Sequence, residues 1–270
     1  MAIVNRTPDS FYDRGATFDT SAAMRRVDEV VAAGAEIVDI GGVKAAPGSE
    51  VTAAQEIERV VDFVAAVRQR HPRVVISVDT WRAEVGRAAC AAGADVLNDA
   101  WGGVDPELAE VAARFGAGLV CTHAGGQRPR TRPHRISYED VCADILRTVT
   151  GLAERAEACG VDPARIVIDP GHDFGKNTWH SLAATRMVPQ LVDTGWPVLM
   201  SLSNKDFVGE SLGAALDDRL TGTLAVTALT AGWGARVFRA HNVRQTRDTL
   251  DMVSTVLGHR RPVRAVRGLA

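Results

Sequence analysis

Three polar residues, Asp79, Asn98 and Asp169, stand at or near the ends of short apolar runs, where their neighbours are expected to be buried. A buried carboxylate or amide needs a hydrogen-bonding partner. Any one of the three could cap a helix, because Asp and Asn do so routinely. Together, two carboxylates and an amide suit a flat heterocycle that displays both N–H donors and carbonyl acceptors. The three residues therefore predict a heterocycle site, provided that the runs converge in space.

Positively charged side chains accompany the last two apolar runs of the chain. Lys205 follows the seventh run, and Arg239 and His241 belong to the eighth. Cations gathered in this way suit a phosphate group. Near the start of the chain, Asn5 and Asp9 offer oxygen ligands for a loosely held Mg²⁺ that also rests on substrate phosphates. The sequence has no paired cysteines and no H-x-x-x-H pattern, so a tightly bound structural metal is not expected.

Eight short apolar runs must position these side chains, and helical patterns separate the runs. Residues 53–70 repeat apolar residues at steps of three and four, which predicts a helix with one buried face. Alternation of strand and helix over about 250 residues favours an α/β fold, an eight-stranded parallel β/α (TIM) barrel. An open, doubly wound sheet alternates in the same way and is the structural alternative. The runs are residues 2–5, 36–40, 74–79, 95–99, 118–123, 165–169, 197–203 and 236–241.

The carboxyl ends of the strands meet at one face of such a barrel, and catalytic residues lie there. The candidate residues sit at these ends or in the loops that follow, so we expect them to converge. Neither a linker nor a shift in composition divides the chain, which predicts a single barrel domain over residues 1–258. The basic tail, residues 259–270, is expected to be a solvated terminus, with an interaction arm as the alternative.

Charge and cysteine content argue against several classes of protein. The chain carries 31 basic and 33 acidic residues, so no overall field attracts it to nucleic acid or to an anionic membrane. The four cysteines lie far apart with no C-x-x-C, which predicts reduced thiols and a cytoplasmic location. Polar Asn5 comes early and no run of 18 apolar residues occurs, so neither a signal peptide nor a membrane-spanning segment is expected.

Seven short motifs follow one another along nearly the whole chain: NRTPDSF, DIGG…PG, SVDT, LND, DPGHDFGK, SNKDFVG and RAHNV. In this order they resemble the motifs of dihydropteroate synthase, a pterin-binding barrel enzyme of folate biosynthesis. The resemblance implies condensation of 6-hydroxymethyl-dihydropterin pyrophosphate with 4-aminobenzoate, and release of pyrophosphate. It also implies the use of Mg²⁺ and assembly as a homodimer.

The resemblance gives each candidate residue a role. It implies that the pterin ring is held by Asp79, Asn98, Asp169 and Lys205, the pyrophosphate by Arg239 and His241, magnesium by Asn5, and the aminobenzoate by a slot of Phe11, Pro47, Phe174 and Ser203. Asp9, the mobile acidic residue of the first loop, and Lys205 would take part in catalysis. The implied reaction is a nucleophilic displacement at an activated CH₂. Ring binding would orient that carbon, while magnesium and cations stabilise the departing pyrophosphate.

The loop after the second run departs from the family pattern. The family reads Gly-Gly-Glu-Ser-Thr-Arg-Pro-Gly where this chain reads GGVKAAPG. Ala45 thus replaces a Thr of the aminobenzoate slot, and Ala46 replaces an Arg that reaches the pyrophosphate. Further along, Asn204 replaces a second Arg, and Asp173 replaces a Gly near the second substrate. Lys44, two residues from the missing Arg, could substitute in part, but an ammonium cannot reproduce a guanidinium fork.

These departures predict a pterin pocket with weak or lost synthase activity. A hydrogen bond to a charged group contributes about 1.5 to 3 kcal/mol, so one missing Arg costs on the order of 10- to 100-fold in rate. The three losses together could reach ~10⁴-fold if they add, which neighbouring groups often do not. The alternatives are an active synthase with unusual loops, a non-catalytic pterin-binding or interaction protein, and a barrel enzyme that uses another pyrophosphate or amine.

Overall fold

The computed structural model describes residues 1–7, 19–131 and 136–268. Six parallel strands form one sheet in chain order, and two further parallel strands pair with each other. The strands are β1 (Ala2–Asn5), β2 (Ile37–Gly41), β3 (Val75–Asp79), β4 (Val96–Asp99), β5 (Gly118–Thr122), β6 (Ile166–Asp169), β7 (Leu199–Met200) and β8 (Val237–Phe238). The predicted α/β fold with parallel strands is confirmed.

Backbone contacts join the two-stranded sheet to the six-stranded one on both sides. Ala2 of β1 forms an isolated parallel bridge with Ala240, just beyond β8, and Ile168 of β6 forms one with Val198, just before β7. The N–H groups of Ala240 and Ile168 donate to the carbonyls of Met1 (2.9 Å) and Pro197 (3.0 Å). The ends of the large sheet thus each meet the small sheet, although closure into a complete barrel stays a prediction at this point.

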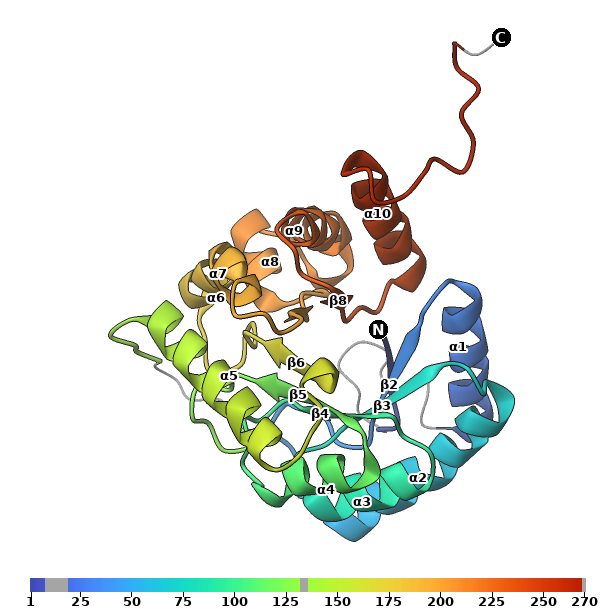
Figure 1. Ribbon diagram of the computed structural model, residues 1–270, viewed down its shortest axis with the longest axis vertical. Coiled ribbons are helices and arrows are strands. Elements are labelled where there is room, and N and C mark those ends of the chain that lie inside the picture. Colours follow the sequence, from blue (N-terminus) through green and yellow to red (C-terminus); the bar gives the residue numbers. More distant parts are fainter. Residues whose placement is uncertain (8–18, 132–135, 269–270) are drawn as a thin grey trace.

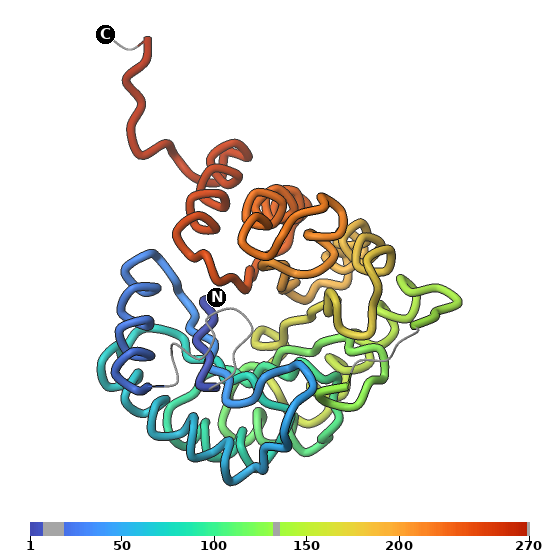
Figure 2. Tube along the Cα trace, turned by 180° about the vertical axis from the view of Figure 1, so that it is seen from behind, coloured from blue at the N-terminus to red at the C-terminus, as the bar shows by residue number. Residues whose placement is uncertain are grey.

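Helices lie around the outside of the strands, as Figures 1 and 2 show from opposite sides. They are α1 (Thr20–Ala32), α2 (Ala53–Arg70), α3 (Ala83–Ala91), α4 (Glu107–Phe115), α5 (Val141–Ala158), α6 (Thr178–Arg186), α7 (Val188–Val192), α8 (Asp206–Leu212), α9 (Leu220–Gly232) and α10 (Val243–Val256). Among the described residues, none of the helices has both the length and the apolar character needed to cross a bilayer. After α10 the chain runs away from the body of the molecule, and residues 259–268 are exposed.

Helix α2 shows how the sequence specifies these elements. Thr52 caps its first turn in a capping box with Gln55, in which each residue satisfies a backbone N–H of the other. Val60 and Val64, one turn apart, are fully buried against the sheet. The strands beneath are β-branched runs with buried side chains on both faces, as expected of a parallel sheet covered by helices. This packing fixes where each strand ends, and so where its polar residues lie.

Candidate functional site

A cavity of about 450 Å³ opens at the carboxyl ends of the strands. It brings together most of the candidate residues: Asn5, Asp79, Asn98, Asp169, Phe174, Ser203, Lys205, Arg239 and His241 all line it. Pro47 is exposed and is not among the residues that line the cavity. Asp9 and Phe11 lie outside the described residues. Convergence of the strand ends, the condition for the predicted site, is therefore met.

Asp39, the middle residue of β2 and not among the predicted site residues, holds several of these side chains in place. Its fully buried carboxylate accepts hydrogen bonds from Ser77 Oγ (2.6 Å), Asn98 Nδ2 (3.2 Å) and Arg239 Nε (2.6 Å). Arg239 also donates through Nη2 to Asp79, at 3.0 Å. Asp39 thus links Asn98, predicted to hold a heterocycle, to Arg239, predicted to hold phosphate, and Arg239 extends the network to Asp79.

The two predicted heterocycle carboxylates have unusual proton affinities. Burial raises the pKa of Asp79 to about 7, against the opposing effect of Arg239. Burial also raises the pKa of Asp169, while Lys205 and the Gly171 N–H, which donates at 2.7 Å, act in the other direction. A carboxyl with a pKa near 7, such as that of Asp79, can exchange a proton with a ring nitrogen near neutral pH.

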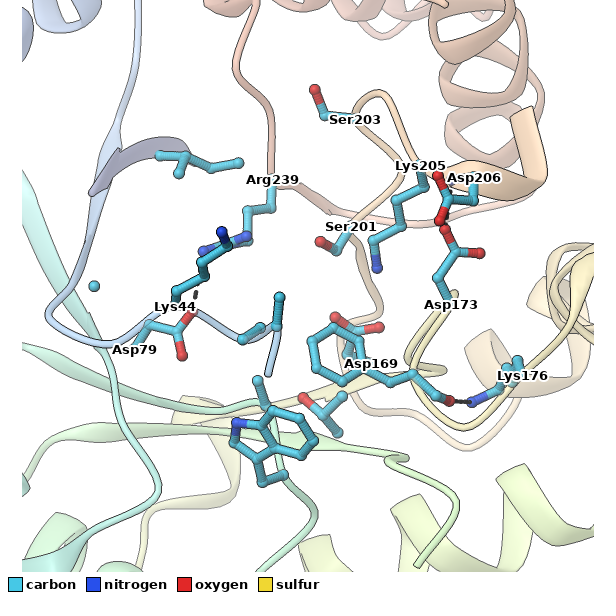
Figure 3. Close-up of a pocket in the computed structure, with 18 of the residues that line it drawn as sticks. Lys44, Asp79, Asp169, Asp173, Lys176, Ser201, Ser203, Lys205, Asp206 and Arg239 are labelled. Atoms are coloured by element: carbon cyan, nitrogen blue, oxygen red, sulfur yellow. Dashed lines mark hydrogen bonds and ion pairs between the residues drawn. The ribbon is translucent and has the colours of Figure 1, made fainter. Parts of the chain in front are cut away.

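Phe174 and Trp101 form an aromatic part of the cavity wall. Lys205 donates to the His172 carbonyl, and its Nζ lies 5.1 Å from the centroid of the Phe174 ring. The Phe174 ring meets Trp101 edge to face, with centroids 5.1 Å apart. Trp101 is buried and lines the cavity. We did not predict Trp101 from the sequence, although its place two residues after the LND motif offered a signal. Figure 3 shows Lys205 reaching into the cavity on the side of Asp169 and Asp173.

Lys176, the last residue of the DPGHDFGK motif, stabilises the loop after β6 through hydrogen bonds. Its buried ammonium donates to the carbonyls of His123 (3.2 Å), Gly171 (3.0 Å) and Phe174 (3.0 Å), and it lies 2.6 Å from His123 Nδ1. Burial lowers the pKa of Lys176 to about 7 and that of His123 to about 4. The other ring nitrogen of His123 lies 2.8 Å from Asp144. These contacts set the position of Phe174, and sequence reasoning missed them.

The altered loop after β2 forms part of the cavity wall. Ala45 and Ala46 both line the cavity and present only methyl groups there. Arg130, in the loop after β5, donates to the carbonyls of Ala46 (3.4 Å) and Ser49. The Arg130 side chain therefore joins the two loops, and neither alanine offers a ligand the side-chain donors that Thr or Arg would offer.

The other two departures from the family pattern occupy left-handed backbone positions. Asp173 has φ 65°, and its carboxylate accepts hydrogen bonds from the Asp206 N–H (2.7 Å) and Ser181 Oγ (3.1 Å). It therefore caps the first turn of α8 as well as adding negative charge to the cavity wall. Asn204 has φ 57°, is buried, and points its amide at Asn242 Oδ1, 3.5 Å away.

The described residues contain no group of three His, Cys, Asp or Glu side chains that could hold a metal ion. Asn5 lines the cavity and offers one amide oxygen. This donor set does not fit a tightly held metal. It does fit a Mg²⁺ whose remaining ligands are water and the phosphates of a bound substrate.

A parallel α/β fold with a cavity and a buried polar cluster at the carboxyl ends of its strands is the arrangement in which α/β enzymes bind their substrates. Residues 1–241 match the family described as pterin binding enzyme, and the chain belongs to that family. The predicted resemblance is thereby confirmed. The chain is 59% identical to a protein of Mycobacterium leprae named inactive dihydropteroate synthase 2, over all of this chain and 94% of that one.

Solved structures of synthases are more distant in sequence but close in fold. The dihydropteroate synthase of Yersinia pestis, solved as a sulfonamide drug complex, aligns with a TM-score of 0.90 at 33% identity, over 96% of this chain and 94% of that one. The synthase of Xanthomonas albilineans, solved with 4-aminobenzoic acid, aligns with a TM-score of 0.85 at 35% identity, over 95% and 92%.

Proposed function

We propose that this protein binds a pterin, as 6-hydroxymethyl-dihydropterin pyrophosphate or a close relative, and has lost most or all synthase activity. One observation carries the proposal: one cavity is lined by all four residues predicted to hold the ring and by the three residues that replace the Thr and two Arg of the family motif. The set kept is Asp79, Asn98, Asp169 and Lys205, and the replaced positions are Ala45, Ala46 and Asn204.

The physical reason lies in when each group acts. Groups that hold the ring bind the substrate before, during and after the reaction, so they contribute affinity. A guanidinium at the pyrophosphate stabilises charge that develops as the bond breaks, so its loss lowers the rate. A guanidinium at the aminobenzoate binds a charge that is present throughout, so its loss weakens binding of the second substrate. Each lost charged hydrogen bond contributes about 1.5 to 3 kcal/mol, which is on the order of 10- to 100-fold in rate.

The sequence identities to known relatives support a loss of synthase activity. The protein named an inactive synthase is 59% identical to this chain, whereas the two solved synthases are 33% and 35% identical. The X. albilineans synthase was solved with 4-aminobenzoic acid. If this chain meets the same second substrate, Asp173 places a carboxylate beside another anion, which weakens its binding.

Three further features of the family are part of the proposal. The eight strands close into a barrel, supported by the bridges at Ala2 and Ile168. The protein uses Mg²⁺ when a phosphorylated ligand is bound, with Asn5 and the phosphates as ligands. It is a homodimer, supported by the exposed apolar side chains Leu229, Met252, Val256 and Leu257 on and beside α9 and α10. The free thiols of its four cysteines suit a reducing, cytoplasmic location.

Two measurements on the purified protein test the main proposal. Calorimetric titration with 6-hydroxymethyl-dihydropterin pyrophosphate should give saturable heat. A coupled assay for released pyrophosphate, with 4-aminobenzoate present, should give turnover at least ~10³-fold below that of a synthase assayed in parallel. No binding at millimolar ligand would refute the retained pocket. Turnover at the level of a true synthase would instead support the alternative of an active enzyme.

A gain-of-function variant tests the cause of the deficit. Ala45→Thr, Ala46→Arg and Asn204→Arg together should raise turnover by at least ~10²-fold, because they return the donors to the cavity wall. Gln245→Arg, which adds a positive charge at an exposed position of α10, is the matched control and should change nothing. A triple variant that folds, binds pterin and stays inactive would show that these three positions are not the cause.

A further inference from the structure

Three side chains form a line of contacts from the cavity to the outside of the molecule. Lys176 lines the cavity, and its Nζ lies 2.6 Å from Nδ1 of His123. Nε2 of the same ring lies 2.8 Å from Oδ2 of Asp144, in the first turn of α5. The His123 side chain is fully buried, whereas the Asp144 side chain is 28% exposed. Because α5 belongs to the outer layer of helices (Figure 1), these contacts connect the cavity wall to the surface of the protein.

The chemistry of the three groups gives each hydrogen bond a direction. An ammonium carries only donors, so Nδ1 of His123 accepts from Lys176. Burial lowers the pKa of His123 to about 4, so its ring is neutral near pH 7 and its single N–H lies on Nε2. That N–H donates to the Asp144 carboxylate. Because linked hydrogen bonds polarise one another, the negative charge of Asp144 strengthens the bond that His123 accepts from Lys176.

Asp144 also helps to keep the buried Lys176 charged. Burial lowers the pKa of Lys176 to about 7 and Lys205 lowers it further, while Asp169, Asp144 and Asp173 act in the other direction. An ammonium has three N–H groups, whereas a neutral amine has two. Four acceptors surround Nζ, namely His123 Nδ1 and the carbonyls of His123, Gly171 and Phe174. Loss of the Asp144 charge therefore leaves fewer of these buried acceptors with a donor.

The loop after β6 (residues 170–177, the β6 loop) depends on these hydrogen bonds for its shape. Its backbone is left-handed at Gly171 (φ 65°), Asp173 (φ 65°) and Gly175 (φ 58°), so no regular ladder of hydrogen bonds supports it. Lys176 donates to the carbonyls of Gly171 and Phe174, both at 3.0 Å. A single ammonium thus joins the beginning of the β6 loop to its end.

The β6 loop in turn positions two of the residues predicted to hold the pterin ring. The Gly171 N–H donates to Asp169 at 2.7 Å, and the His172 carbonyl accepts from Lys205. Nζ of Lys205 also lies 5.1 Å from the centroid of the Phe174 ring. Figure 3 shows Asp169 and Lys205 directed into the cavity from this side. A change in the shape of the β6 loop therefore displaces groups that contact the ligand.

We propose that Asp144 is a positioning residue for the pterin site: from the outer surface it acts through His123 and Lys176 on the β6 loop, and so sets the affinity of the cavity for its ligand. The inference rests on the proposed function, which supplies the ligand. Neither Asp144 nor His123 is among the residues that line the cavity, so their effect on the ligand is indirect.

Calorimetric titration with 6-hydroxymethyl-dihydropterin pyrophosphate measures this effect. Asp144→Asn keeps the shape of the side chain and removes its charge, and it should weaken binding by about 3- to 30-fold, the range for residues that act on a site through others. Asp144→Glu keeps the carboxylate and should weaken binding by less than about 2-fold. Arg147→Met is the matched control, because Arg147 pairs with the other oxygen of Asp144 at the surface. This control leaves the contact with His123 in place and should not change the affinity.

A double-mutant cycle and a measurement without ligand test the route through Lys176. In a Lys176→Met background, Asp144→Asn should weaken binding by less than about 2-fold, because the group through which it acts is gone. Hydrogen exchange followed by mass spectrometry should show faster exchange in the β6 loop for Asp144→Asn and no change there for Arg147→Met. A purely structural role of Asp144 in α5 instead predicts the same loss of affinity in both backgrounds and an unchanged β6 loop.

Three results would overturn the inference. They are wild-type affinity in Asp144→Asn, an equal loss of affinity with and without Lys176, and unchanged exchange in the β6 loop. In each case the wild-type protein still binds the pterin, so the proposed function survives. A wild-type protein that binds no pterin overturns both.

Discussion

Removal of the Asp39 carboxylate is expected to be among the most damaging single changes to this fold. Asp39 is fully buried and pairs with Arg239 at 2.6 Å, while Ser77 and Asn98 donate to the same group. Truncation of one partner of a buried ion pair costs about 3 to 5 kcal/mol, because the other charge is left uncompensated. In a chain of this size, 1 kcal/mol shifts Tm by about 2 to 4 °C. Asp39→Ala should therefore lower Tm by about 6 to 20 °C.

Urea denaturation followed by circular dichroism measures the loss of unfolding free energy. Asp248→Ala is the matched control, because Asp248 pairs with Arg244 at the surface, where the two side chains are 58% and 71% exposed. An exposed pair contributes at most about 1 kcal/mol. If the two variants lose the same stability, the Asp39 carboxylate is not the buried hub described above, and the argument that it positions Arg239 and Asn98 fails with it.

Two further changes probe the β6 loop. The pKa of Lys176 falls from 10.5 in the unfolded chain to about 7 in the fold. Between pH 7 and pH 10.5 the unfolded state therefore binds more protons than the folded state. Because of this difference, Lys176 makes the free energy of unfolding rise with pH in that range. Lys176→Met should remove that rise, and an unchanged slope in urea titrations from pH 7 to 10 would contradict it. Asp173→Gly should change stability by less than about 1 kcal/mol, because relief of the left-handed backbone offsets the lost cap on Asp206. Asp173→Ala keeps the backbone cost and loses the cap, so it should cost about 1 to 2 kcal/mol more than Asp173→Gly in the same assay.

The first six strands could be predicted from the sequence to within one residue at each end, because each is a compact β-branched run bounded by a turn. The last two could not. The runs at 197–203 and 236–241 predict strands of normal length, but only Leu199–Met200 and Val237–Phe238 form them. Outside these two pairs of residues, each run keeps a single isolated bridge, at Val198 and at Ala240. The polar residues Ser201, Ser203, Arg239 and His241 of the two runs line the cavity.

In the candidate site, residues marked by a local sequence pattern could be predicted, whereas contacts between residues distant in the sequence could not. Asp79, Asn98 and Asp169 could be identified because a polar residue at the end of an apolar run is visible in the sequence. The pairing of Asp39 with Arg239 could not, because 200 positions separate the two and spacing does not tell which carboxylate meets which cation. Lys176 was visible as a motif residue, but its three carbonyl partners depend on how the β6 loop turns.

The left-handed backbone at Asn204 bears on how such a protein evolves. Asn adopts this conformation several times more readily than most residues, whereas an Arg there carries a strain of about 1 kcal/mol. Restoring the Arg of the family motif in this chain would therefore trade about 1 kcal/mol of stability for the donors that it returns to the cavity wall, a common trade between stability and activity. Once turnover is dispensable, selection on stability alone favours Asn, and the reverse substitution has to climb in free energy. The stability of the fold therefore opposes a return from Asn to Arg at position 204.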